Sequence, residues 1–315
     1  MRLPEHLYLL EKKMKFYQLQ QANFLFALSG GQDSLSLLAA FLELKKLYPL
    51  SIRCIHVHHG EGQNKDYRDQ VLQHLQNLCE AEKLTLVCKK NRSKELCSEE
   101  DFRNFRWQCI YEEKQADELV VTAHHWRDQF ESRMMHLIRG CGPEGLLAMQ
   151  EYAEGIFRPL IECNEKQLKM FYQNHDFTVM QDPSNQDMSY FRNWLRHVWL
   201  PQLETAEKGS YHRMAQSLVN ISEQWISKKA SYQQWLHGEK LLRRFSLDLD
   251  FSHQLQVLSL FLRQNRIFGF QRGQLEEILK RLDCRKKDYI FSMLGRQWHV
   301  GPEEIVLLDQ SADES

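Results

Sequence analysis

The stretch Phe24-Leu25-Phe26-Ala27-Leu28-Ser29-Gly30-Gly31-Gln32-Asp33-Ser34 runs from an apolar, β-rich segment through a glycine pair into a helical pattern. A strand that enters a helix through such a turn is typical of parallel α/β sheets. The turn predicts an anion site, because two glycines let the backbone approach a polyphosphate and a helix N-terminus presents unpaired N–H groups. Ser29 and Ser34 add hydroxyl donors to this predicted site.

The same stretch excludes two common phosphate motifs. It lacks the Lys-Ser/Thr ending of a Walker A loop and the three-glycine spacing of a dinucleotide fingerprint. The structural alternative is a tight turn in which Asp33 or Ser34 caps the helix.

Further along the chain, β-rich runs alternate with helical patterns. Strands are predicted at 24–28, 52–57, 84–88 and 118–122, and helices at 33–47 and 66–83. This order predicts an α/β fold, a Rossmann-like parallel sheet that binds ligands at the carboxyl ends of its strands. After Pro201 a long amphipathic helix, helices at 255–262 and 275–282, and a strand at 305–308 are expected. We therefore predict a catalytic domain over 1–205 and a linker helix with a smaller, mainly helical domain over 206–315.

Composition limits the class of protein. No run of about 18 uncharged apolar residues occurs, and the first 15 residues do not resemble a signal peptide, so we expect a cytoplasmic protein without membrane segments. The eight cysteines include no C-x-x-C pair, which argues against zinc, iron–sulfur and redox dithiol sites. The net charge of -1 does not by itself indicate a nucleic-acid binder.

Ser-Gly-Gly-x-Asp-Ser after the first strand resembles the signature of the PP-loop ATP pyrophosphatases. The resemblance implies cleavage of ATP between its α and β phosphates and transfer of AMP to an oxygen of the substrate. It also implies that Asp33 places the nucleotide or its Mg²⁺, and that the pyrophosphate is bound by the whole loop, Ser29, Gly30, Gly31, Gln32, Asp33 and Ser34. Alone it leaves open GMP, asparagine and NAD synthetases, tRNA thiolases and lysidine synthetases.

Further segments resemble lysidine synthetases in order and spacing. They are the His-rich turn 56–60, the charged helix 99–107, and the segments 122–132, 139–146 and 182–196. The resemblance, which covers about residues 20–200, implies catalytic roles for Asp33, Asp128, Arg103 and Arg106. It implies substrate binding by His124, His125, Glu131, Arg139, Asn185, Arg192, Asn193 and Arg196.

The sequence departs from the family pattern at four positions. Arg127 stands where Asp is frequent, Ser132 where Thr is usual, Trp107 where Tyr is usual and Phe102 where Ala is usual. If two carboxylates are needed for metal or lysine, Asp128 must act with Glu131 or Asp33.

The implied reaction joins L-lysine to the wobble cytidine of a tRNA-Ile with a CAU anticodon, using ATP and Mg²⁺ through an adenylated cytidine. Arg103 or Arg106 would stabilise the negative charge that develops on the phosphates. Asp128 with His124 or His125 would accept the proton of the lysine ammonium. Arg192 and Arg196 would contact RNA phosphates, and the C-terminal domain would bind tRNA. The sequence leaves open whether the protein forms a homodimer.

Several alternatives stay open on the residues alone. A tRNA thiolase would carry out the same adenylation, although such enzymes generally carry paired cysteines, and a non-catalytic nucleotide-binding module is a second rival. His56, His58 and His59 are more often loop histidines than metal ligands. Arg103 and Arg106 can form a salt-bridge ladder with Glu99. The turn at 182–185 is also a good generic one.

Overall fold

The computed structural model describes residues 3–61, 64–92, 98–282 and 288–308. The chain divides into two compact units, Met1–Ser222 and Glu223–Ser315. The division falls inside the long helix α9 (Ser210–Tyr232), later in the chain than the predicted boundary at 205/206. None of the helices within these described ranges is both long enough and apolar enough to cross a membrane.

Unit 1 contains a six-stranded sheet in the order β3-β2-β1-β4-β6-β5. All neighbouring strands are parallel except β5, which is antiparallel to β6. The four predicted strands are confirmed, and the α/β class with them. The strands are β1 (Asn23–Ala27), β2 (Ser51–His58), β3 (Thr85–Lys90), β4 (Glu118–Val121), β5 (Tyr152–Ala153) and β6 (Ile156–Phe157).

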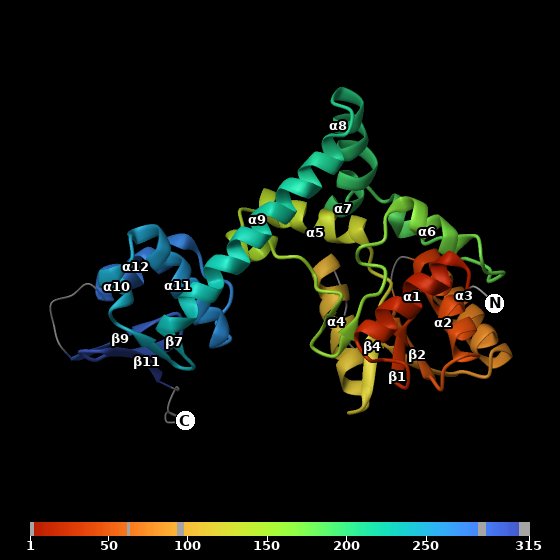
Figure 1. Cartoon of the computed structure of the whole chain (residues 1–315), viewed down its shortest axis with the longest axis horizontal. Coiled ribbons are helices and arrows are strands. Elements are labelled where there is room, and N and C mark those ends of the chain that lie inside the picture. Colours follow the sequence, from red (N-terminus) through yellow and green to blue (C-terminus); the bar gives the residue numbers. More distant parts are fainter. Residues whose placement is uncertain (1–2, 62–63, 93–97, 283–287, 309–315) are drawn as a thin grey trace. The chain divides into compact units, whose positions relative to one another are not determined.

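Helices cover both faces of this sheet, because its central strand is apolar on both sides. Phe24 and Phe26 of β1 pack on one face with a cluster from α1, α2, α3 and α6, and Leu25 packs on the other with α4. Figure 1 shows α4 on the opposite side of the strands from α1–α3. The helices are α1 (Glu5–Phe16), α2 (Gln32–Lys45), α3 (Lys65–Ala81), α4 (Glu99–Glu113), α5 (Trp126–Ile138), α6 (Glu165–Tyr172), α7 (Phe191–Trp194) and α8 (Leu200–Ala206).

The parallel topology places three connections at one edge of the sheet. The turn after β1, the His-rich turn after β2 and the segment after β4 all leave carboxyl ends of adjacent strands. Ligands of such sheets bind at this edge. A π-helical turn, Leu195–Trp199, joins α7 to α8. A second apolar cluster, with Phe130 of α5, Leu195 and Leu218 among its members, packs this segment and the start of α9 against α5.

Unit 2 combines helices with a five-stranded antiparallel sheet in the order β7-β8-β11-β10-β9. The predicted helices at 255–262 and 275–282 lie in α11 and α12, and the predicted strand at 305–308 lies in β11. The other four strands were not predicted. The elements are α10 (Phe245–Asp248), α11 (Phe251–Gln264), α12 (Arg272–Leu282), β7 (Leu236–His237), β8 (Lys240–Leu242), β9 (Tyr289–Met293), β10 (Arg296–Val300) and β11 (Glu304–Leu308).

Candidate functional site

The glycine turn after β1 holds its shape through its two serines. The Gly31 N–H donates to Ser29 Oγ over 3.2 Å, and the Ser34 hydroxyl, which is buried, donates to the Gly31 carbonyl over 3.0 Å. Gly31 is the N-cap of α2, and no described side chain caps the helix. The structural alternative, a cap by Asp33 or Ser34, is therefore not what the structure shows, and the first N–H groups of α2 stay open to an anion.

Position 30 requires glycine. Its φ of +81° lies in the left-handed region, and a Cβ there would stand 2.7 Å from Val71 Cγ1 of α3. Its carbonyl accepts the Met180 N–H over 3.2 Å. The turn is thus fixed between α3 and the segment that follows α6.

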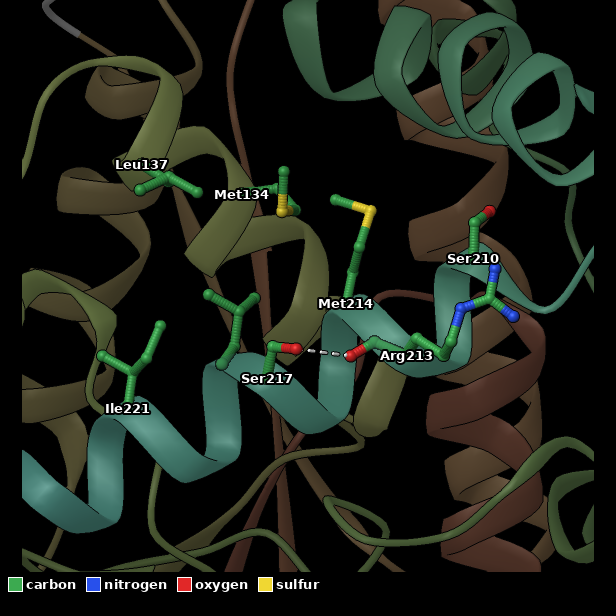
Figure 2. A pocket seen from close by; sticks show the side chains of 8 residues that line it. Met134, Leu137, Ser210, Arg213, Met214, Ser217 and Ile221 are labelled. Atoms are coloured by element: carbon green, nitrogen blue, oxygen red, sulfur yellow. Dashed lines mark hydrogen bonds between the residues drawn. The ribbon is translucent and has the colours of Figure 1, made fainter. Parts of the chain in front are cut away.

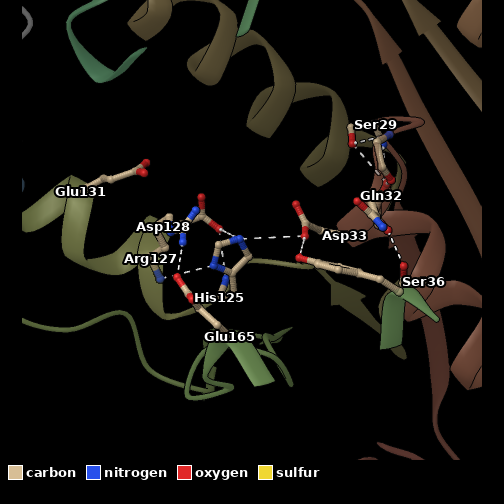
Figure 3. A network of polar contacts seen from close by, with 12 residues as sticks. Ser29, Gln32, Asp33, Ser36, His125, Arg127, Asp128, Glu131 and Glu165 are labelled. Carbon is tan, nitrogen blue, oxygen red and sulfur yellow. Dashed lines mark hydrogen bonds and ion pairs between the residues drawn. The ribbon is translucent and has the colours of Figure 1, made fainter. Parts of the chain in front are cut away.

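Asp33 lies in the first turn of α2, and Figure 3 shows its carboxylate facing His125. Tyr172 of α6 donates its hydroxyl hydrogen bond to Asp33 Oδ1, and His125 Nε2 lies 3.9 Å from the same oxygen. None of the described residues donates to Oδ2. Burial and then the Asp33 charge raise the pKa of Tyr172, so the phenol stays protonated as a donor. One oxygen of Asp33 is therefore held, and the other is available.

His125 connects the two helix N-termini at the site. Its Nδ1 accepts the Arg127 N–H over 3.3 Å, so in the neutral ring the proton is assigned to Nε2. Nε2 lies 3.5 Å from Asp128 Oδ2 and 3.9 Å from Asp33 Oδ1. The ring is buried, and it links the two carboxylates predicted to act in catalysis.

Asp128 is part of the capping box of α5. Its Oδ2 accepts the His125 N–H over 3.0 Å, and its Oδ1 lies 3.5 Å from Arg196. Burial opposes ionisation of Asp128, but its interactions with His125 and His124, the cap hydrogen bond and the nearby Arg196 outweigh burial and lower the pKa of the carboxyl. The carboxylate is therefore charged at neutral pH.

Glu131 lies one turn further along α5 and is completely buried. Arg196 donates two hydrogen bonds to it, at 2.7 and 2.6 Å. Arg192 donates to Ser132 Oγ over 3.1 Å and pairs with Glu99 at 3.1 Å. Both arginines thus use some of their N–H groups in contacts with protein carboxylates. Their contact with RNA stays a prediction.

A second group of positive charges comes from α4 and the end of β6. Arg106 donates to His59 Nε2 over 3.4 Å. The surrounding protein, and then the charges of Arg103 and Arg192, lower the pKa of Arg106, although its side chain keeps an exposed surface. Burial lowers the pKa of His124, and positive charges that include Arg158 lower it further. His124 is therefore neutral, with its Nδ1 bonded to Thr122 Oγ1 over 2.8 Å.

The histidines of the predicted turn 56–60 have separate partners, and His56 and His58 belong to the end of β2, so only His59 lies in the turn that follows. His56 Nδ1 bonds the Leu28 carbonyl at 2.9 Å and His58 Nε2 bonds Asp69 at 3.0 Å. Burial, followed by the charges of Arg106 and Arg68, lowers the pKa of His59 to about 3. Across the part of the chain that the structure describes, no group of three or more His, Cys, Asp or Glu side chains is arranged to hold a metal ion.

The remaining predicted residues divide into two sets. Asn193 is buried and donates to the carbonyls of Ser184 and Asp187, so it holds the turn that presents the exposed Asn185. Arg139 is exposed at the C-terminal end of α5, whereas Asp128 lies at its N-terminal end. Arg139 is therefore not brought together with the other predicted residues.

Two features of the site were missed by the sequence analysis. Tyr172 and His175, which bonds Ser36 Oγ at 2.8 Å, fix the start of α2 from a segment 139 residues later in the chain. Arg127 pairs with Glu165 of α6, a contact visible in Figure 3. The only sequence signal was the amphipathic pattern of α6, which does not indicate what its polar side chains touch.

An apolar pocket lies elsewhere in unit 1, between α5 and α9, with a volume of about 310 Å³. Figure 2 shows Met134 and Leu137 opposite Met214 and Ile221. Its lining contains no carboxylate or histidine, so it offers no acid–base chemistry.

The chain resembles known proteins over most of its length. A profile of the PP-loop domain family matches residues 7–203. A tRNA(Ile)-lysidine synthase of Bdellovibrio bacteriovorus is 34% identical over 305 residues, covering 93% of this chain and 94% of the relative. One of Haemophilus influenzae is 40% identical over 294 residues, which cover 86% of this chain and 66% of that protein. The chain thus spans nearly all of the first relative and about two thirds of the second.

One solved structure resembles the fold. It is described as the U34-tRNA thiolase NcsA from Methanococcus maripaludis with its [4Fe-4S] cluster. The match has a TM-score of 0.52 and 18% identity, and it covers 70% of this chain and 79% of that one. At this identity the match shows a shared fold only.

Proposed function

Because this chain belongs to the tRNA(Ile)-lysidine synthase family within the PP-loop proteins, we propose that it joins L-lysine to the wobble cytidine of a tRNA-Ile bearing a CAU anticodon. ATP is consumed and AMP and pyrophosphate are released. The observation that carries the proposal is the junction of an open phosphate turn with two linked carboxylates, Asp33 and Asp128, on the helices that follow β1 and β4. A cytoplasmic location follows from the tRNA substrate.

The residues present fit Mg²⁺ together with ATP. Mg²⁺ is usually held by one or two carboxylates and by substrate phosphates. Asp33 keeps one oxygen clear of the described donors, and the open N-terminus of α2 follows the same turn. When bound, the ion would neutralise phosphate charge. Tyr172 and His125 would keep the Asp33 carboxylate aimed at it.

The first step is adenylation of the base. The cytidine 2-oxygen attacks the α phosphorus of ATP, the bond between the α phosphorus and the bridging oxygen breaks, and pyrophosphate leaves. The N–H groups of the 29–34 turn bind the departing pyrophosphate, and Arg103 and Arg106 stabilise charge that develops on the phosphates. Neither arginine forms a salt bridge with any described carboxylate, so both guanidinium groups keep donors for this role.

The second step is attack by the lysine ε-amine on the base carbon that carries AMP. A new carbon–nitrogen bond forms, the carbon–oxygen bond breaks and AMP leaves. The ammonium, with a free pKa of about 10.4, must first lose a proton. Asp128, ionised beside neutral His124 and within 3.5 Å of His125 Nε2, is suited to bind the ammonium and accept that proton. Arg196, which donates two hydrogen bonds to Glu131, lies 3.5 Å from Asp128 Oδ1 and would help to hold that carboxylate in place.

The experiment is to incubate the protein with ATP, labelled lysine and unmodified tRNA-Ile transcript. We expect pyrophosphate and labelled tRNA in equal amounts, and no label in a transcript whose wobble base is uridine. Pyrophosphate without lysine incorporation would refute the ligase proposal. Sulfur transfer in place of lysine would favour the thiolase alternative, which the absence of paired cysteines in the sequence disfavours.

A further inference from the structure

The outward side of α4 carries a row of side chains four residues apart, Arg103, Trp107 and Tyr111, which we call the α4 strip. Residues at this spacing lie side by side on a helix, about 6 Å apart along its axis. The Trp107 and Tyr111 rings stack, with centroids 5.6 Å apart and an interplanar angle of 28°. Tyr111 is 51% exposed. An aromatic stack of this kind on a surface is a large apolar area left open to solvent.

The α4 strip begins at the proposed reaction site. Arg103 and Arg106 stand at its N-terminal end, where their charges act on His124, the neighbour of Asp128. Since α4 precedes β4 in a parallel sheet, its N-terminus lies at the carboxyl edge of the strands and its C-terminus away from it. Tyr111 is thus the member of the strip furthest from the reacting atoms.

Positive charge accompanies the aromatic rings. Arg158 lies at the end of β6, where burial lowers its pKa, and it is close enough to Tyr111, Glu154 and Arg103 for these neighbours to influence that pKa as well. Its Nε is buried without a hydrogen-bond partner, and one of its other nitrogens donates to the Gln150 carbonyl over 3.0 Å. Within the described ranges, neither Arg103 nor Arg158 is paired with a carboxylate. These guanidinium groups are therefore available to phosphates.

We infer that the α4 strip, together with Arg158, is a docking platform for single-stranded RNA, and that it stacks a nucleotide flanking the target cytidine of the anticodon loop. Unstacked bases bind by stacking on exposed aromatic rings, and the phosphates beside them bind to arginines that have no carboxylate partner. The α4 strip and Arg158 provide both kinds of group. The inference rests on the proposed function, which requires a loop nucleotide to reach Asp128. When the target cytidine leaves the anticodon loop, the nucleotides next to it lose a stacking partner. The α4 strip would replace that partner.

The test measures binding of a synthetic CAU anticodon stem–loop by fluorescence anisotropy, with Tyr111→Ala, Trp107→Ala and Trp107→Phe variants. Each alanine variant should weaken binding roughly 5- to 150-fold, as expected for one lost base stack, while Trp107→Phe stays near wild type. Phe16→Ala, which removes a 77% exposed ring at the end of α1, is the matched control and should change nothing. Affinity for ATP should stay constant in all of them.

A second measurement covers the risk that Trp107→Ala disturbs packing, because Trp107 also touches the apolar cluster beneath α4. With 2-aminopurine beside the target cytidine, binding to wild type should quench its fluorescence, and Tyr111→Ala should reduce the quenching. Arg158→Gln should lower the slope of affinity against salt by about 0.7. Unchanged affinity and quenching in both alanine variants would overturn the platform. Failure of the wild-type protein to bind the stem–loop would instead overturn the proposed function.

Discussion

Asp33 has one carboxylate oxygen held by Tyr172 and the other open, so its substitution should affect chemistry more than folding. We expect Asp33→Asn to lower pyrophosphate release by at least about 10²-fold, because the neutral amide cannot balance charge beside the phosphates. The melting temperature should stay near wild type. Asp66→Asn is the matched control, since Asp66 is an exposed residue in the first turn of α3. Near-normal release by Asp33→Asn would remove Asp33 from the mechanism.

Asp128 allows the two chemical steps to be separated. Asn at this position can still accept the His125 N–H bond that caps α5, so the helix start should persist. We expect Asp128→Asn to slow amine attack roughly 10²- to 10⁴-fold while adenylation continues, so that adenylated tRNA accumulates with lysine present. Acid-quenched single-turnover reactions with labelled ATP would detect it.

The control for this substitution is Asp101→Asn, because Asp101 makes the same capping contact in α4, with the Ser98 N–H at 3.1 Å. If Asp128→Asn abolishes adenylation as well, Asp128 serves ATP rather than lysine. Equal rates of both steps in mutant and wild type would show that it serves neither.

At the scale of single residues, local order in the sequence was enough to predict the positions of Asp33, His125 and Asp128, since each follows a strand that ends at the same edge of the sheet. Tyr172 could not be predicted in this way. Its hydroxyl meets Asp33 through a fold-dependent contact between residues 139 apart, and a tyrosine on an amphipathic helix is more often a packing residue. The pairing of Arg127 with Glu165 was missed for the same reason.

Among the elements, α6 connects the two helices that carry the proposed catalytic carboxylates, because Glu165 at its start contacts Arg127 of α5 and Tyr172 at its end contacts Asp33 of α2. Asn164 caps it by accepting the Gln167 N–H over 3.0 Å. We expect Asn164→Ala to lower the free energy of unfolding by about 0.5–2 kcal/mol, as measured by urea denaturation. Asn164→Asp, which keeps the cap, should retain wild-type stability, and equal loss in both variants would exclude a capping effect.

Elements differed in how readily the sequence predicted them. In unit 1, β1, β2 and β4 are mostly buried on both faces and, like the half-buried β3, appear as apolar runs, which is why these four were identified. In unit 2, β9 shows an alternating, partly exposed pattern, and β7 and β8 have two and three residues. β7 and β9 pair with their chain neighbours β8 and β10 in tight hairpins, whereas β8 joins the rest of the sheet only by pairing with β11, far along the chain. Strands this short or this exposed gain their stability from pairing, which local patterns do not report.

In the whole molecule, all residues of the proposed reaction site belong to unit 1. Removal of unit 2 should therefore lower the affinity for RNA without removing the residues proposed for catalysis. We expect a protein ending at Ser222 to bind ATP normally but to bind tRNA more weakly, with a smaller dependence of affinity on salt. Calorimetry with ATP and filter binding at several salt concentrations would measure both. Circular dichroism would establish that the shortened protein is folded. Unchanged tRNA affinity would mean that unit 2 contributes no RNA contacts.

The molecule should also lose stability in mild acid. Burial, as the largest cause, lowers the pKa of six histidines of unit 1, His6, His56, His58, His59, His124 and His175. In the unfolded chain these rings gain protons as the pH falls below about 6.5, whereas the folded protein keeps them neutral. Stability present above pH 6.5 is therefore lost on acidification, by up to about 1.4 kcal/mol per pH unit for each fully buried ring.

Urea denaturation at pH 7.5 and 5.5 would measure this loss. A free energy of unfolding that is equal at the two values would contradict the assigned pKa directions.

The segment from Tyr172 to Met180 reaches back to the phosphate turn through Asp33, Ser36 and the Gly30 carbonyl. During synthesis the ribosome releases the turn long before it releases this segment. A nascent chain that ends before Tyr172 therefore carries the whole signature of the nucleotide site without the contacts that fix it. During translation the chain therefore contains the motif before it can form the complete nucleotide site. The site is completed only after more than half of the residues have been made.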